Sequence, residues 1–300
     1  MSKNTINKNT PAVTNENTDK PKVGIVDVGG GLRGIYGSGV LDRCMDKGIR
    51  FDHCYGVSAG AANMVSYLAG QTRRNLVFYM VYAFRDEYMS MHNFVRHQNY
   101  IDLDYVYGTL TNAGGENPLD YKAMMANPAG LTVVGSNART GEVRYFDKSE
   151  IPQNDYSILK ATCAIPVVCK PQQVGENYYF DGGLGDPVPV KYAMENGCDK
   201  VVLVLTKPRD CMRASRQDQQ FARVMKRRYP QAARNLSLRA LRYNKSVRYA
   251  QQLEKEGKVL IIAPDNIEGM KTLTKDKSVL MDLYLKGYKD AAEIEAFMNV

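Results

Sequence analysis

Short apolar runs alternate with amphipathic stretches along this chain, a pattern typical of proteins in which strands and helices follow one another. The apolar runs predict strands at 23–28, 51–55, 131–136, 143–146, 178–181, 201–206 and 258–263. Apolar positions at helical spacing predict helices at 35–47, 61–69, 156–164 and 277–298. A turn near Gly141 joins two of the strands into a predicted hairpin. The run at 201–206 is apolar enough for a parallel strand buried on both faces. The pattern therefore predicts an α/β fold, without internal repeats.

A serine flanked by glycines follows the second predicted strand. The pentapeptide Gly56-Val57-Ser58-Ala59-Gly60 lies between the strand at 51–55 and the helix at 61–69, which Gly70 ends. On such a sharp turn the serine backbone is strained, only small neighbours fit at Gly56 and Gly60, and the hydroxyl is exposed at the sheet edge. The helix behind it directs its N-terminal dipole at nearby negative charge. This pattern indicates a nucleophile elbow, although G-x-S-x-G also occurs in turns whose serine has no role.

The first predicted strand runs directly into a glycine-rich loop, Gly29-Gly30-Gly31-Leu32-Arg33-Gly34. Glycines let the backbone approach a bound group and turn its N–H donors toward it. For an acyl-transfer serine this loop is a candidate oxyanion hole, in which one donor lowers the barrier by about 3 kcal/mol. The loop also contains the dinucleotide fingerprint G-x-G-x-x-G, with Asp46 or Asp52 as the acid for a ribose. The serine on the next strand favours the oxyanion hole, because a dinucleotide site does not use it.

The candidate base is an aspartate at the end of an aromatic strand. Asp181 follows residues 178–180 and precedes the pair Gly182-Gly183. Carboxylates at strand ends of an open α/β sheet lie where ligands bind, whereas D-G by itself is the usual signal of a turn. Every histidine precedes Asp181 in the chain, namely His53, His92 and His97. The usual hydrolase order of serine, acid and histidine is therefore absent, and we expect Asp181 to act directly on Ser58.

In this order, the motifs G-G-G-x-R-G, G-V-S-A-G and D-G-G resemble the patatin-like phospholipase family over about residues 21–205. The resemblance implies a three-layer, modified α/β-hydrolase fold and a Ser-Asp dyad, with Ser58 as nucleophile and Asp181 as base. It also implies an oxyanion hole formed by backbone donors of Gly30, Gly31 and their neighbours. Arg33 matches the family's basic residue in this loop, with bracing of the loop by a salt bridge as its alternative role. Val28 replaces the acidic residue or glycine of many members, which leaves the backbone donors intact.

The resemblance further implies hydrolysis of phospholipid or lysophospholipid esters through an acyl-serine intermediate. Acyl transfer to an acceptor other than water and a non-catalytic, lipid-binding or scaffold role are the alternatives. Residues 71–125 are rich in Tyr, Met and Phe and are a candidate acyl pocket or lid, although core packing explains this composition equally well.

Composition limits the class of protein further. With 300 residues, 44% of them hydrophobic, the chain is long enough for one large domain with an appended piece. Residues 1–20 are polar and lack an apolar segment, which predicts a disordered tail and not a signal peptide. No apolar run approaches the ~20 residues that span a bilayer. The six cysteines lack metal-binding spacing and are expected to be reduced thiols of a cytoplasmic protein without metal or cofactor.

Positive charge is concentrated in one segment. The formal net charge is +8, and residues 207–258 hold 15 Lys and Arg against four Asp and Glu. Helices with one apolar side are predicted here, that side being formed by Phe221, Val224, Met225, Tyr229, Leu238, Leu241 and Tyr249. The basic side is either a solvated surface or a contact for anionic lipid headgroups, where each charge contributes roughly 1 kcal/mol. No nucleic-acid motif accompanies it. We therefore expect a core at 21–205 and a basic, mainly helical region at 206–300.

Overall fold

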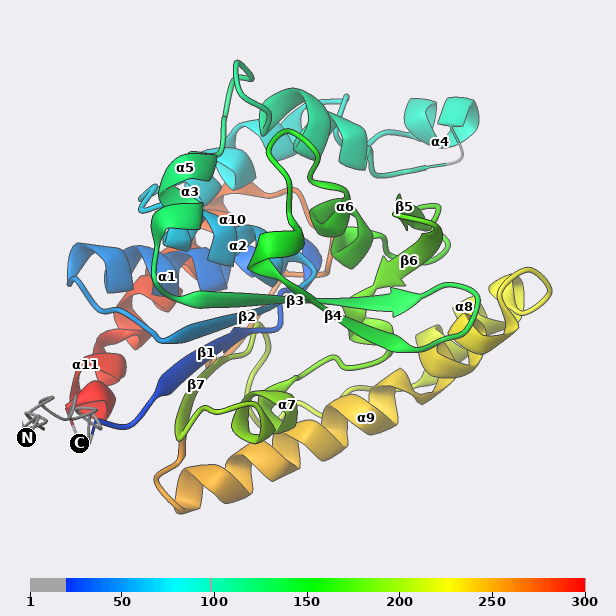
Figure 1. The fold of residues 1–300 in the computed structure, drawn as a ribbon. Helices are drawn as coiled ribbons and strands as arrows, with labels where there is room; N and C mark the ends of the chain where they lie inside the picture. Colours follow the sequence, from blue (N-terminus) through cyan, green and yellow to red (C-terminus); the bar gives the residue numbers. More distant parts are fainter. Residues whose placement is uncertain (1–19, 98, 300) are drawn as a thin grey trace, which may run out of the picture.

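The computed structural model describes residues 20–97 and 99–299, so the tail predicted for residues 1–20 lies outside the described residues except for Lys20. The described residues form one mostly parallel sheet of eight strands with helices on both faces (Figure 1). Its strand order is β5-β6-β3-β2-β1-β7-β8, and β4 also pairs with β3. The strands are β1 Val23–Asp27, β2 His53–Val57, β3 Gly130–Asn137, β4 Val143–Asp147, β5 Gln172–Val174, β6 Asn177–Asp181, β7 Lys200–Val204 and β8 Val259–Ile262.

The centre of the sheet is parallel and buried on both faces. Strand β1 pairs in parallel with β2 and β7, which pair in turn with β3 and β8. Because successive side chains of a strand point to opposite faces, Ile25 joins the larger hydrophobic core and Val26 the smaller one. Strand β7 alternates in the same way, and the four residues 201–204 are fully buried. The parallel strand predicted at 201–206 is thereby confirmed.

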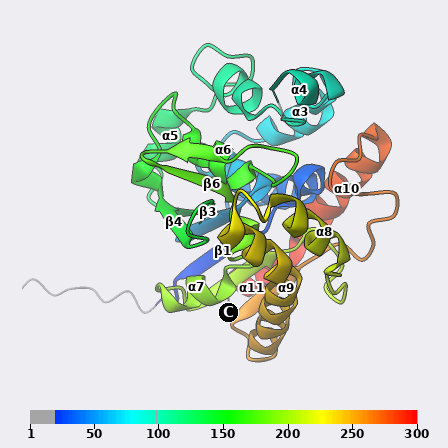
Figure 2. The ribbon, with the colours of Figure 1, turned by 90° about the vertical axis from the view of Figure 1, so that its right-hand side faces the viewer.

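Helices cover both faces and complete three layers. Helices α1, α2 and α10 lie on one face of the sheet, and α7 and α9 lie on the other (Figure 1). Seen from the side, α3 and α4 gather at one end of the molecule, far from α7 and α9 (Figure 2). The helices are α1 Ile35–Asp46, α2 Ala59–Leu68, α3 Arg74–Met80, α4 Met91–His97, α5 Tyr121–Ala126, α6 Ser157–Cys163, α7 Val190–Glu195, α8 Arg216–Met225, α9 Pro230–Lys255, α10 Lys277–Asp290 and α11 Ala292–Met298. None of the described helices is both long and apolar enough to cross a bilayer.

The C-terminal third is built into the sheet and its helical layer. Strand β8 extends the sheet beside β7, and α10 packs closely on α1. A Cβ atom added to Gly39 would lie 2.1 Å from the carbonyl oxygen of Tyr284, and one added to Gly287 would lie 2.1 Å from that of Tyr36. These two glycines let the helix backbones approach each other. The predicted division at residue 205 stays a prediction about domain organisation.

The predicted elements are present, with two corrections. The hairpin of 131–136 and 143–146 is confirmed by the antiparallel pairing of β3 with β4. The single helix predicted at 277–298 is instead two helices, because the chain turns at the buried Ala291 before it buries Ile294. The apolar sides predicted for the two basic helices are also partly wrong, and Val224 of α8 is 71% exposed. In α9, Leu241 is 67% exposed, and the buried side is formed by alanines together with Leu236, Tyr243, Val247 and Leu253.

Candidate active site

Ser58 occupies a strained turn between β2 and α2. Its φ of 56° and ψ of −130° place a non-glycine residue where backbones rarely lie, as in a nucleophile elbow. The Ser58 N–H donates to the Thr162 hydroxyl at 2.9 Å, which fixes the turn. A Cβ atom on Gly60 would lie 2.2 Å from the Asp27 carbonyl oxygen, and one on Gly56 would lie 2.4 Å from the Ala61 Cα. Both glycines are therefore required for the contact of α2 with the sheet.

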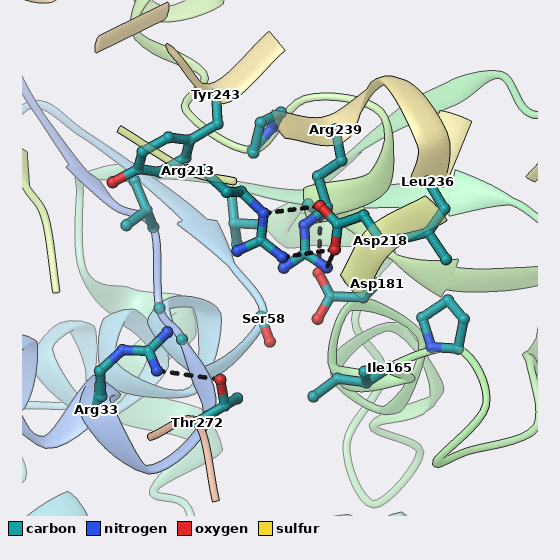
Figure 3. Close-up of a pocket in the computed structure, with 18 of the residues that line it drawn as sticks. Arg33, Ser58, Ile165, Asp181, Arg213, Asp218, Leu236, Arg239, Tyr243 and Thr272 are labelled. Atoms are coloured by element: carbon teal, nitrogen blue, oxygen red, sulfur yellow. Dashed lines mark hydrogen bonds and ion pairs between the residues drawn. The ribbon is translucent and has the colours of Figure 1, made fainter. Parts of the chain in front are cut away.

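The register of β3 brings Asp181 beside Ser58. Val57 of β2 pairs with Val134, and Asp181 of β6 pairs with the next residue, Gly135. Because β4 occupies the opposite edge of β3, β2 and β6 share one edge and their ends meet. Figure 3 shows the Ser58 hydroxyl and the Asp181 carboxylate facing each other across the same cavity. The two side chains singled out in the sequence are thus adjacent although 123 positions separate them.

The electrostatics around Asp181 suit a base. Asp181 is 5% exposed, and burial raises its pKa above the ordinary value of an aspartate. The positive charge of Arg239, the Ser58 hydroxyl and the Gly183 N–H oppose this rise, the last by a hydrogen bond of 2.8 Å to Oδ1. The effect of burial is the largest, so the pKa of Asp181 is raised and its carboxylate is more basic than one in water.

The glycine loop has two kinds of N–H group. Gly29, Gly30 and Gly31 all have positive φ, which an L-residue with a side chain adopts only with strain. The Gly29 N–H donates to Asp27 Oδ1 at 2.8 Å, and the Leu32 N–H donates to the Thr272 carbonyl at 2.8 Å. Gly34 serves packing, because a Cβ there would lie 2.5 Å from the Tyr79 hydroxyl oxygen. In the described part of the chain, the N–H groups of Gly30 and Gly31 have no acceptor.

A buried acid stands behind the loop and the elbow. Asp27 is fully buried, accepts hydrogen bonds from the Gly29 N–H and from Asn63 Nδ2, both at 2.8 Å, and has its pKa raised to about 6 by burial. Asn63 Nδ2 also donates to the Gly34 carbonyl at 2.8 Å. This pair ties β1, the loop and α2 together. The sequence signal for this role is a charged residue at the end of an apolar strand, which does not by itself distinguish Asp27 from an ordinary strand end.

Arg33 points into the site from the same loop. Its Nη1 donates to the Thr272 hydroxyl at 3.0 Å, and burial and the nearby Arg213 lower its pKa to about 10. No carboxylate lies within 4 Å of Arg33 among the described residues. The bracing salt bridge given as an alternative role is therefore wrong, because a threonine from a distant loop braces the loop instead.

Two cavities meet at Ser58. The larger, of about 220 Å³, also contains Asp181, Gly30, Arg33, Arg213 and Arg239. The smaller, of about 60 Å³, shares Ser58 and Ile165 with the larger and is mostly apolar. Most of its walls come from the segment 71–125 that the sequence marked as a candidate acyl pocket, through Phe78, Tyr79, Tyr88, Ile101, Leu103, Val106, Tyr107 and Leu110.

The acids considered for a dinucleotide site and the histidines considered as a base lie away from the glycine loop and Ser58. Asp52 accepts the Val23 N–H at the far end of β1, and Asp46 pairs with Arg73, so neither acid serves the glycine loop. His53 shares a hydrogen bond of 2.8 Å with Thr132, and His92 is exposed on α4. No histidine lines either cavity among the described residues. Within 20–97 and 99–299, no group of three or more His, Cys, Asp or Glu side chains is placed to hold a metal ion.

Several residues of the site were not found by sequence reasoning. Thr162 and Thr272 brace the elbow and the loop, and Arg213, Asp218 and Arg239 line the larger cavity. The cations belong to the basic segment 207–258, but its charge did not show which of them turn inward. No short motif marks any of these positions.

A three-layer α/β fold with a serine elbow, a glycine loop and a strand-end aspartate defines a class of hydrolase-like proteins. Residues 28–194 match the family model of the patatin-like phospholipases, so the chain belongs to that family. Residues 229–299 match a domain of unknown function, DUF6363.

One curated protein and one solved structure are similar to parts of this chain. The uncharacterized protein YjjU of Escherichia coli (strain K12) is 31% identical over 194 residues, which are 62% of this chain and 52% of YjjU. The chain thus spans about half the length of this relative. The crystal structure of VipD from Legionella pneumophila aligns with 93% of this chain and 67% of its own, at 16% identity and a TM-score of 0.46.

Proposed function

We propose that this protein is a serine hydrolase of lipid esters that uses Ser58 and Asp181 as a dyad. The observation that carries the proposal is the strained Ser58 facing a buried Asp181 where an apolar and a basic cavity meet. Membership of the patatin-like phospholipase family supports the same reaction class.

The proposed reaction has two steps. Asp181 accepts the Ser58 proton while Oγ attacks the ester carbonyl, and the N–H groups of Gly30 and Gly31 donate to the oxyanion. When the tetrahedral intermediate collapses, the alcohol leaves with the proton from Asp181 and an acyl-serine remains. Water then gives its proton to Asp181, attacks the acyl carbon and releases the fatty acid, and the proton returns to Ser58.

Fewer backbone N–H groups of the glycine loop are proposed to bind the oxyanion than the sequence predicted. The N–H groups of Gly29 and Leu32 already have acceptors, which position the loop. The proposal therefore assigns oxyanion binding to Gly30 and Gly31, supported by the start of α2, whose first N–H groups lack partners within the helix. The apolar cavity beside Ser58 is the proposed place for the start of the acyl chain.

Turnover of a neutral monoacyl ester tests this proposal. Wild-type protein is expected to release fatty acid from a monoacylglycerol, and Ser58→Ala protein is not. Equal release by both proteins would contradict the proposal, as would a folded wild type that releases none.

The pH profile is expected to show the raised Asp181 pKa. Asp181 must be ionised to accept a proton, so kcat/KM falls as the pH falls through this pKa, which lies above the ~3.9 of an exposed aspartate. Because Arg239 lowers this pKa, Arg239→Gln is expected to move the acid limb to higher pH. The exposed Arg248 on the same helix provides the control, Arg248→Gln, which leaves the limb in place. A profile without an ionisation between about pH 4 and 7 would contradict the role of Asp181.

We also propose that the outer face of α8 and α9 contacts anionic membranes. Most cations of 207–258 are exposed, including Arg216, Arg223, Lys226, Arg227, Arg234, Lys245, Arg248 and Lys255. Exposed charges attract an anionic surface within a Debye length of about 10 Å at 0.1 M salt.

Sedimentation with anionic vesicles measures this contact. Binding is expected to fall about tenfold or more between roughly 0.05 and 0.5 M salt, and to weaken in the double variant Arg223→Glu/Arg227→Glu. Arg50→Glu/Lys122→Glu reverses two exposed charges outside 207–258 and is the control. Salt-independent binding would rule out an electrostatic contact.

A further inference from the structure

The larger cavity has a basic wall opposite the nucleophile. Arg33 comes from the glycine loop, Lys207 follows β7, Arg213 precedes α8, and Arg239 lies on α9. Figure 3 shows Arg33, Arg213 and Arg239 converging on the space in front of Ser58 and Asp181. Four cations from four separate segments thus line one cavity.

The two carboxylates that line this cavity carry less negative charge than the positive charge of its four cations. Asp218, which is 2% exposed, accepts two hydrogen bonds of 2.8 Å from Arg213, through Nε and Nη2. The same carboxylate is the ion partner of Arg239, whose Nη1 lies 4.0 Å away. The other carboxylate of the cavity belongs to Asp181, whose proposed role is that of the base.

Two further observations point to an absent anion. Arg33 is 93% buried, and its Nε has no hydrogen-bond acceptor among the described residues. Burial and the neighbouring cations together lower the pKa of Arg33, Lys207 and Arg239. A buried donor without an acceptor and mutually repelling cations are both costly. A bound anion would relieve both costs.

We propose that this basic wall binds the phosphate of the substrate's headgroup, so that the preferred substrate is an anionic monoacyl phospholipid. Arginine donors match phosphate oxygens in a bidentate manner. Arg239 and Thr272, which braces Arg33, belong to the segment that matches a domain of unknown function. That segment would then contribute one of the four cations, Arg239, and would brace a second one, Arg33, through Thr272. This inference rests on the proposed hydrolase function.

The test compares two esters with the same acyl chain, 1-acylglycerol 3-phosphate and 1-acylglycerol. The ratio of their kcat/KM values cancels effects on the shared chemical step. Wild type is expected to prefer the phosphate ester, and Arg239→Gln to lower the ratio by about 10- to 100-fold, as for loss of a charged hydrogen bond. Arg239→Lys is expected to restore part of it. Arg50→Gln, a change of an exposed arginine outside the basic segment 207–258, is expected to leave the ratio unchanged.

Three outcomes would overturn the inference. One is a wild-type protein whose kcat/KM values for the two esters are about equal at low ionic strength. This measurement does not depend on the folding of any variant. Another is an unchanged ratio in folded Arg239→Gln protein. The third is competition by inorganic phosphate against 1-acylglycerol without any preference for the phosphate ester, which would indicate a free-phosphate site. If the protein hydrolyses 1-acylglycerol but gives one of these results, the inference of phosphate binding is wrong and the proposed hydrolase function still stands.

Phosphate binding is separable from catalysis. Glycerol 3-phosphate is expected to raise the Tm of Ser58→Ala protein and to raise it less in Ser58→Ala/Arg239→Gln, because a ligand of the folded state stabilises it. A Tm that does not respond in Ser58→Ala protein would contradict phosphate binding, whatever the protein does to esters.

Discussion

Ser58→Ala and Asp181→Asn are each expected to lower kcat/KM for a neutral monoacyl ester by at least about 10³-fold. Ser58→Ala removes the oxygen that forms the acyl bond. Asp181→Asn keeps the shape of the side chain and the acceptor for the Gly183 N–H, but an amide does not take up the serine proton. Steady-state rates near neutral pH measure both losses.

The double variant distinguishes a dyad from two separate contributions. Residues that act as one unit give non-additive losses, so Ser58→Ala/Asp181→Asn is expected to retain about the activity of Ser58→Ala alone. Asp181→Asn protein with wild-type rates would assign the base to another group. Circular dichroism and Tm of each variant show whether the fold is kept.

Gly60→Ala is expected to lower the free energy of unfolding by about 3 kcal/mol, at the upper end of the overpacking range. The added Cβ would lie 2.2 Å from the Asp27 carbonyl oxygen and 2.7 Å from its carbonyl carbon. Backbone atoms of a central strand do not move aside easily, so α2 must shift away from β1. Because Ser58 immediately precedes α2, activity is expected to fall as well. Urea unfolding gives the free energy.

Gly108→Ala is the matched control for this substitution. A Cβ on Gly108 would meet nothing within 4 Å, so the change is expected to be neutral or to stabilise by up to about 1 kcal/mol. If Gly60→Ala were as stable as Gly108→Ala, the close contact of α2 with β1 would be wrong.

The sequence predicted seven of the eight strands because burial leaves apolar runs, as at 201–206. It did not predict β5 or the short helices α3, α4, α5 and α7. It also singled out Ser58 and Asp181 as candidates, since each lies in a short motif whose glycines have a local structural role, and the fold brings the two side chains together. Gly56 and Gly60 are needed where α2 meets the sheet. Local constraints of this kind can be recognised without a structure.

Contacts between distant segments left no comparable signal. Thr272 braces a loop some 240 positions earlier, and Arg239 reaches the cavity from a helix with many similar arginines. The buried side of α9 was mispredicted for a related reason. Ala240 and Ala250 are buried together with the larger Val247, whereas Leu241 is exposed. Size alone did not indicate the buried side.

Site-mapped labelling by a fluorophosphonate tests the central claim most directly. The probe forms a stable adduct with an activated serine, and peptide mass spectrometry identifies the modified residue. We predict one adduct per chain, on Ser58, with much slower labelling in Asp181→Asn and none in Ser58→Ala. Labelling at another serine, or a folded wild type that does not react, would contradict the proposal that Ser58 is a nucleophile activated by Asp181.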